Sequence, residues 1–238
     1  RVPRLRMPKN SAWALVSLFK ATGKDEYLRR AIKLTTRFKR CLTLVDDHYS
    51  WNYWDPAGEW DIHPDDPSKW KHWINAEHRG GYYSLSVSQA VLMYELGLVF
   101  DRQDLDRFVR TQTQVCWNGD YDNPVWRLTN GTVAEEPRYQ PPYLCEWLAP
   151  FDKRVWEMAF GAPAQFTRLH AKDHSWQGGP VAGNWLVAKY ITLPRLRGGR
   201  PAETRWVERF RNQPENVAFI QELAYTVEGE GYQAPLTP

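Results

Sequence analysis

Five side chains suited to acid–base chemistry on an acidic substrate lie within nine positions of the chain: Asn75, His78, Arg79, Tyr82 and Tyr83. Removing the proton next to a carboxylate develops an enolate, and Asn, Arg or protonated His can stabilise that negative charge. A His or a Tyr can take the proton, and a Tyr can return one to the leaving oxygen. This set predicts β-elimination on a uronate-containing polysaccharide, with His78, Tyr82, Asn75 and Arg79 as the catalytic residues.

Gly80 and Gly81 connect His78 to an apolar helix. Glycine tolerates positive φ and a close backbone approach, and the helix N-terminus disfavours a cation, so the neutral imidazole is the expected base. If the two glycines continue the helical turn, Tyr82 points the same way as His78; otherwise Tyr83 is the better partner. In the alternative, structural interpretation, His78 and Arg79 pair with nearby acids and tie down the loop.

Two polar loops rich in tryptophan precede apolar helices. Five of the 13 Trp lie between Trp51 and Trp73, in a stretch broken by three Pro, which is typical of a loop. The second loop, residues 174–179, repeats the pairing of His and Trp with Gly-Gly. Flat rings with a polar edge suit a core, an interface or a sugar. We predict a cleft whose substrate-binding residues are Trp51, Trp54, Tyr83, His174, Trp176 and Gln177.

Two other functions fit the same loops. A glycoside hydrolase would use two carboxylates that flank the glycosidic bond, and the candidates are Asp55, Glu59, Asp61 and Glu77. A non-catalytic carbohydrate-binding domain would use the Trp platforms and not His78. The histidine spacings match no established metal-ligand pattern, and the sequence indicates neither a metal nor another cofactor.

Composition restricts the class of protein. The chain has 238 residues, of which 42% are hydrophobic and 25% charged, as in a globular protein. The net charge of +3 does not indicate nucleic-acid binding, and no apolar stretch has the length of a membrane span. Three Cys without a CxxC motif do not indicate a zinc site, and Cys41 and Cys116 are expected as buried thiols. The expected partner is a polysaccharide or oligosaccharide, and no oligomeric state is assigned.

Apolar residues recur at helical spacing along most of the chain. Apolar helices alternate with amphipathic ones across short Gly turns at Gly23 and Gly97, and Asp101 is an expected N-cap. This pattern predicts an all-α fold of antiparallel helix hairpins, with one short β-hairpin near residues 126–132. The expected helices cover residues 11–21, 25–44, 83–96, 101–117, 153–160, 164–171, 181–190, 202–212 and 215–228.

The segment Ala21–Ala31 (ATGKDEYLRRA) resembles the helix-hairpin turn of (α/α)-toroid carbohydrate-active enzymes, and the aromatic loop Trp51–Asp55 is similar in style. That group includes polysaccharide lyases, glycoside hydrolases and sugar epimerases, and its lyases use Asn, His, Tyr and Arg together. The resemblance covers the first half of the chain, and helical-repeat binding proteins have similar turns. It implies an incomplete toroid in a single domain over residues 1–238, with 195–238 as a candidate peripheral extension, in a secreted or periplasmic protein.

Overall fold

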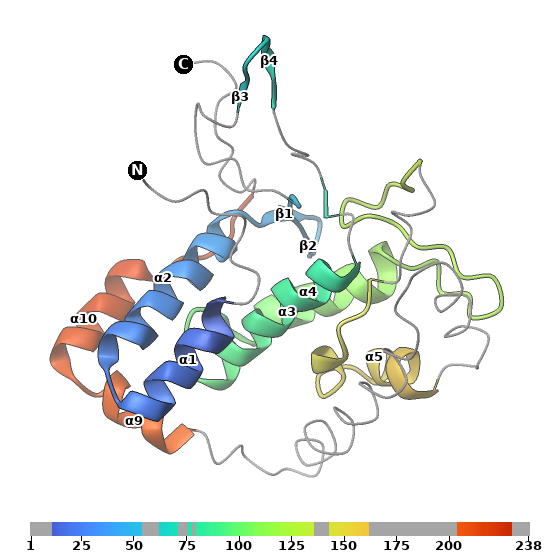
Figure 1. The fold of residues 1–238 in the computed structure, drawn as a ribbon. Coiled ribbons are helices and arrows are strands. Elements are labelled where there is room, and N and C mark those ends of the chain that lie inside the picture. The colour runs from blue at the N-terminus through green and yellow to red at the C-terminus, as the bar shows by residue number, and fades with distance from the viewer. Residues whose placement is uncertain are drawn as a thin grey trace.

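The computed structural model describes residues 11–53, 62–70, 76–77, 80–135, 143–161 and 204–229. The described chain is mostly α-helical, as predicted (Figure 1). Its α-helices are α1 Ser11–Thr22, α2 Asp25–Arg40, α3 Gly80–Glu95, α4 Arg102–Arg110, α5 Lys153–Trp156, α9 Thr204–Arg211 and α10 Pro214–Leu223. Two π-helical turns, η2 Thr111–Val115 and η5 Glu157–Gly161, and the 3₁₀ turn η4 Glu146–Leu148 complete the helical elements.

Helices α1 and α2 form the predicted antiparallel hairpin. Gly23, with φ of 68°, lets its amide donate to the Phe19 carbonyl at 2.7 Å and so ends α1. Asp25 and Glu26 lie in the first turn of α2 and basic side chains in its last turn, an arrangement that complements the helix dipole. The apolar stripe of α2 is buried, with Leu28 and Ala31 fully covered.

Helix α2 ends at Arg40 and does not continue to residue 44, so the prediction was wrong there. Thr43–Val45 form β1, which pairs antiparallel with β2, His48–Ser50. Asp46 adopts a φ of 50° in the turn between the two strands. The amide of Leu44 also donates to the carbonyl of Gly229 at 2.8 Å, so strand pairing overrides the helical spacing of this segment.

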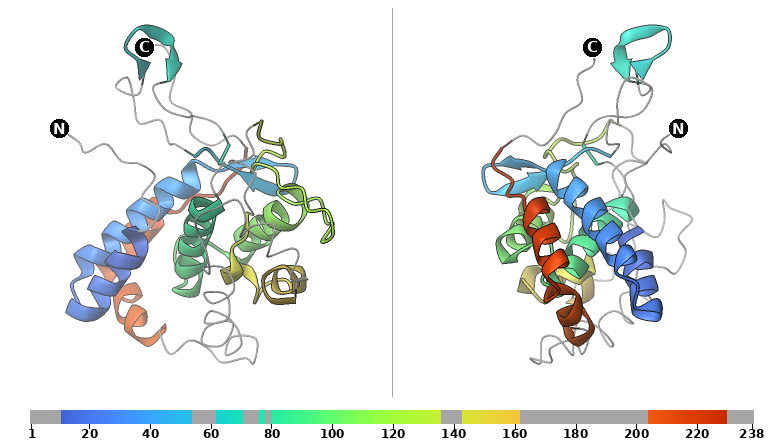
Figure 2. Two further views of the ribbon diagram at one scale, coloured as in Figure 1. Left: turned by 45° about the vertical axis from the view of Figure 1, so that its right-hand side comes forward. Right: turned by 90° about the vertical axis from the view of Figure 1, so that its left-hand side faces the viewer.

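The second hairpin joins β3, Ile62–His63, to β4, Asp66–Trp70. It projects away from the helices in all views (Figures 1 and 2). The hairpin predicted near residues 126–132 is absent from the described structure there. Trp126 forms an isolated β-bridge with Trp117, and a tight turn returns the Leu128 amide to the Thr132 carbonyl at 2.8 Å.

Helix α3 is the central element, buried on most sides as predicted. It packs against α1, α2, α4 and η4. Gly97, with φ of 65°, ends it, and the Leu98 amide donates to the Met93 carbonyl at 2.9 Å. Helix α4 follows and is capped by Asp101 as predicted, through a reciprocal pair of hydrogen bonds with Asp104.

The C-terminal helices α9 and α10 lie beside the α1–α2 hairpin (Figure 2). Phe210 packs its ring edge against Phe19 at 5.8 Å, and Arg29 donates to Asn216 Oδ1 at 2.7 Å. Helix α10 ends at Leu223, short of the predicted residue 228, because the chain then runs to Gly229 beside β1. The helices predicted at 164–171 and 181–190 lie outside the described residues. None of the described helices is long and apolar enough to span a membrane.

The core is a connected group of aromatic rings with one buried ion pair beside it. Phe38 of α2 stacks on Phe108 of α4 at 6.2 Å. Lys39, the next residue, extends its amine to Asp104 Oδ2 at 2.7 Å and to the Val99 carbonyl at 2.9 Å. Both charged side chains are at most 5% exposed. Tyr49 of β2 donates to the other carboxylate oxygen of Asp104 at 2.5 Å, so the pair joins α2, α4 and β2.

We expect Lys39→Met to lower the free energy of unfolding by about 3–5 kcal/mol, because it leaves the buried Asp104 carboxylate without its cation. Denaturant unfolding measures the loss. Lys153→Met is the matched control, since Lys153 pairs with Glu157 on the surface and is 86% exposed; it should change stability little. Equal losses in the two variants would contradict a structural role for the buried pair.

Candidate functional site

The structure describes three of the ten residues predicted for the site: Trp51, Tyr82 and Tyr83. They come together at the N-terminal end of α3, where the segments 51–53 and 76–77 also lie. The other seven predicted residues fall outside the described parts of the chain: Trp54, Asn75, His78, Arg79, His174, Trp176 and Gln177.

Trp51 and Tyr83 are core residues, which corrects their predicted role as sugar platforms. Trp51 is 2% exposed and Tyr83 is fully buried. Their rings stack on each other at 5.4 Å, and the edge of Phe108 covers Trp51. Burial also raises the pKa of the Tyr83 phenol far above its usual value. Trp51 follows Tyr49 by two residues on an extended segment, so both point into the core.

Tyr82 differs from its neighbour because adjacent helical residues project in different directions. It is half-buried, and its ring lies 5.5 Å from that of Tyr53, tilted by 47°. Gly80 and Gly81 form the first turn of α3, and Gly81 has no positive φ. Of the two alternatives left open for these glycines, the structure therefore shows the one in which they belong to the helical turn. Tyr82 is the described candidate whose position leaves part of its side chain accessible.

The carbonyl of Trp51 joins two loops. It accepts hydrogen bonds from the Glu77 amide at 2.9 Å and from Thr129 Oγ1 at 3.1 Å. A bridge between Asn52 and Ala76 strengthens the first contact. Glu77 is fully buried, so this hydrolase candidate has no exposed carboxylate to offer a substrate. Its backbone instead anchors the chain directly before His78 and Arg79.

Below α3, the π-helical turn η2 turns Gln112 inward. Its Oε1 accepts from the Cys145 amide at 2.8 Å and lies 3.4 Å from the Tyr83 hydroxyl. The Nε2 of Gln112 and the Nε1 of Trp51 are buried and have no hydrogen-bond partner among the residues that the structure describes. Burial is the main cause of the raised pKa of both the Cys116 and Cys145 thiols. Both thiols are therefore neutral, and they pack in the protein interior next to the site.

Glu146 is a titratable residue that the sequence analysis missed. It opens η4, which packs against α3. Although part of the residue reaches solvent, the protein around the carboxyl raises its pKa by desolvation. The signal in the sequence is one Glu within an otherwise apolar run, Leu144-Cys145-Glu146-Trp147-Leu148. A carboxyl that keeps its proton up to a higher pH than usual is suited to act as a general acid.

The described residues include no group of three or more His, Cys, Asp or Glu placed to hold a metal ion. The histidines in or near the two aromatic loops are His63, His72, His78 and His174, and of these four only His63 lies in the described part of the chain. It lies on the projecting β3 strand, where its Nδ1 accepts from the Asp65 amide at 3.2 Å. A local turn contact accounts for this imidazole.

We expect Trp51→Ala to cost about 3–5 kcal/mol of unfolding free energy, the usual range for emptying an aromatic core position. Tyr82→Ala serves as the comparison and should cost clearly less, because its ring is only partly covered. Thermal and denaturant unfolding of the two variants would check this order. A Trp51→Ala protein that keeps parental stability and loses only carbohydrate binding would restore the cleft assignment.

We expect Glu146→Gln to stabilise the protein at pH 8. Because the folded state raises the pKa of this carboxyl, its favourable contribution is complete below the unfolded pKa and is lost as pH rises through the folded value. Gln removes that penalty, so the gain in unfolding free energy over the parent should shrink toward pH 4. Glu222→Gln, exposed on α10, is the control and should show no such trend. Parallel pH–stability curves for the parent and Glu146→Gln would contradict the shift.

The chain was compared with protein-family models, with curated proteins and with solved structures, and none of the three comparisons finds a match. The roles of Tyr82, Glu77 and Glu146 therefore rest on their geometry and chemistry.

Proposed function

We propose that the chain is a carbohydrate-active enzyme of the (α/α)-toroid type that cleaves a uronate-containing polysaccharide by β-elimination. The observation that carries the proposal is Tyr82, a half-buried phenol beside Tyr53 in the first turn of α3. The chain directly before His78 and Arg79 is anchored there through Glu77 and Trp51. The helix pairs α1–α2 and α3–α4 support the toroid, as antiparallel hairpins joined by Gly turns.

In this mechanism, Asn75 and Arg79 hold the substrate carboxylate and stabilise the negative charge that develops on it. Neutral His78 takes the proton from the adjacent carbon. The electron pair forms a carbon–carbon double bond, and the bond to the leaving oxygen breaks. Tyr82 gives that oxygen its proton. Tyr83, buried in the core, supports the helix and has no chemical step.

An enzyme of this kind meets its polymer outside the cytoplasm, so we also propose a secreted or periplasmic location.

A second candidate is favoured by Glu146. Its raised pKa is the property expected of the general acid of a glycoside hydrolase. The partner carboxylate would be Asp55, Glu59 or Asp61, because Glu77 is fully buried. In that case the glycosidic bond is cleaved by hydrolysis instead of elimination, and the product has no new double bond. A non-catalytic binding domain, the third alternative, would retain the polymer without cleaving it.

Product chemistry separates the three functions. The protein is incubated with uronate polymers and with neutral polymers, and ultraviolet absorbance and reducing ends are followed together. Elimination yields both signals on uronate polymers only. Reducing ends without absorbance indicate hydrolysis, and retained polymer with neither signal indicates a binding domain.

We expect His78→Ala and Tyr82→Phe each to lower turnover of a uronate polymer by about 10²–10⁴-fold, the usual contribution of a general acid or base. Tyr27→Phe is the matched control, since Tyr27 is also half-buried on a helix, α2, away from the site. It should keep parental turnover, and circular dichroism should show all three variants folded. A Tyr82→Phe variant that turns over polymer at the parental rate would remove Tyr82 from the mechanism.

A further inference from the structure

A tight turn over residues 128–132 carries the only Asn-X-Thr or Asn-X-Ser triplet of the chain, Asn130-Gly131-Thr132. Such a triplet, with any residue except proline in the middle, is the acceptor sequence for N-linked glycosylation. Triplets of this kind also arise by chance, so the surroundings of the triplet decide whether it can be used. None of its three residues takes part in the proposed elimination.

The backbone of the turn is fixed by hydrogen bonds. The Gly131 amide donates to the Leu128 carbonyl at 2.8 Å, and the Leu128 amide donates to the Thr132 carbonyl at 2.8 Å. Gly131 has a φ of 82°, a conformation that glycine adopts at little cost. A Cβ built on Gly131 would lie 3.7 Å from Val115 Cγ1, so the turn rests on η2 at this residue. The triplet is therefore held in one defined conformation.

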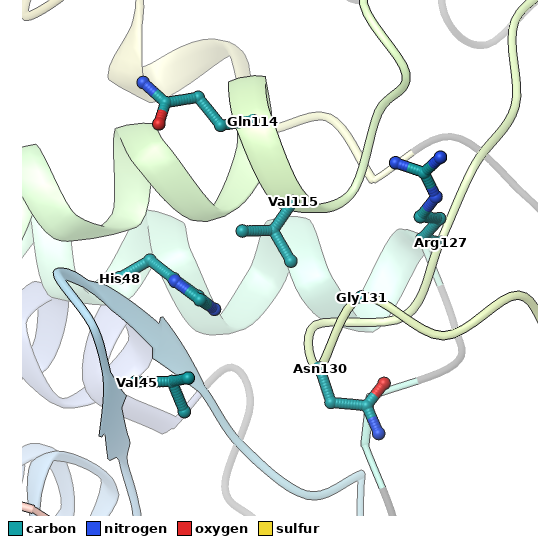
Figure 3. Close-up of a pocket in the computed structure, with 7 residues that line it drawn as sticks. All are labelled: Val45, His48, Gln114, Val115, Arg127, Asn130 and Gly131. Atoms are coloured by element: carbon teal, nitrogen blue, oxygen red, sulfur yellow. The ribbon is translucent and has the colours of Figure 1, made fainter.

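The acceptor side chain is accessible. Asn130 and Thr132 are both exposed, whereas Thr129, directly before them, is fully buried and anchors the turn in the protein. Figure 3 shows the Asn130 amide nitrogen directed away from the hollow that His48 and Val115 line. A transferase can reach this nitrogen from solvent without displacing the turn.

Hydrogen bonds within the triplet orient the side-chain amide. Asn130 Oδ1 accepts from the Thr132 amide at 3.1 Å and from the Thr132 hydroxyl at 2.8 Å. An Asn side chain commonly closes a turn onto the backbone two residues further on, and here the hydroxyl adds a second donor. Within the described part of the chain, no acceptor bonds to Asn130 Nδ2. The oxygen is thus occupied, and the nitrogen that glycosylation requires is the available end of the amide.

We propose that Asn130 is the acceptor of an N-linked glycan. The donor is an oligosaccharide linked to a polyprenyl pyrophosphate, which a transferase of the secretory pathway supplies. Asn130 Nδ2 attacks C1 of the first sugar, and a carbon–nitrogen bond forms. The bond from C1 to the pyrophosphate oxygen breaks, and its electron pair leaves with the pyrophosphate. Nδ2 loses one proton to a base of the transferase, so the product is a neutral amide and nothing is oxidised or reduced.

The assignment rests on the secreted location put forward with the proposed function, and it does not depend on the elimination. An N-linked glycan is bulky and solubilising, and it belongs on the surface of a protein. Val133, the residue after the triplet, is 51% exposed. A sugar attached to Asn130 would lie beside this apolar side chain and reduce its contact with water.

Expression in a eukaryotic cell line tests the proposal, with the full chain placed behind a cleavable signal peptide. Peptide N-glycosidase F releases N-linked glycans and leaves Asp at the glycosylated position, which peptide mass spectrometry then locates. We expect most parent chains to carry one glycan at Asn130, and Asn130→Gln to carry none. Thr132→Val removes the hydroxyl at similar volume and should also lose the glycan, whereas Thr132→Ser should retain it. Asn212→Gln is the matched control, since Asn212 is also exposed but lies outside any such triplet, and it should be glycosylated like the parent.

The outcomes separate this proposal from the proposed function. Occupancy is measured on secreted and on cell-retained chains, so a variant that does not leave the cell is still scored. Parent chains without a glycan in both fractions would overturn the assignment, as would a glycan that persists in Asn130→Gln. Asn130→Gln should cleave a uronate polymer at the parental rate. If the parent protein is glycosylated but cleaves no polymer, the acceptor site stands and elimination falls; if it cleaves polymer and carries no glycan, elimination stands and the acceptor site falls.

Discussion

The buried ion pair between Lys39 and Asp104 is the constraint on which the rest of the structure depends. Two charges inside a protein are tolerated only when both are fully paired. Here the Asp104 carboxylate meets the Lys39 amine, the Tyr49 hydroxyl and the Asp101 amide, so α2, α4 and β2 can pack in only one register. Thr111 Oγ1 then accepts from the Tyr49 amide at 3.0 Å. Two residues after Tyr49, the Trp51 carbonyl holds the segment before the candidate catalytic residues.

The helices could be predicted well from the sequence because the interactions that begin and end them involve neighbouring residues. Gly23 and Gly97 end helices and Asp101 caps one, and each does so through contacts within a few residues. Interactions between distant segments were missed. Apolar spacing continues past Arg40, but pairing with His48–Ser50 and with Gly229 turns residues 43–45 into a strand. No residue close to Arg40 in the sequence indicates that these segments will pair with residues 43–45.

The candidate site was less predictable than the fold. Trp51 opens a polar loop in the sequence, yet alternation with Tyr49 directs its ring inward, where Tyr83 and Phe108 cover it. The π-helical turn that brings Gln112 to Cys145 has no sequence signature of its own, and α-helical spacing describes it equally well. Glu146 becomes notable only through its surroundings, which desolvate its carboxyl. Residue types alone predicted a class of chemistry, while burial decided which rings could meet a ligand.

The three cysteines have a practical consequence. All lie among the described residues and none is in a disulfide; Cys116 and Cys145 are buried with raised pKa values, whereas Cys41 is partly exposed at the C-terminus of α2. Alkylation requires an accessible thiolate, so a maleimide reagent should modify the native protein at Cys41 before the other two. A dye attached there would stand two residues before β1, the strand that carries Val45. The unmodified chain thus already contains a single-site handle for fluorescence measurements beside the β1–β2 hairpin.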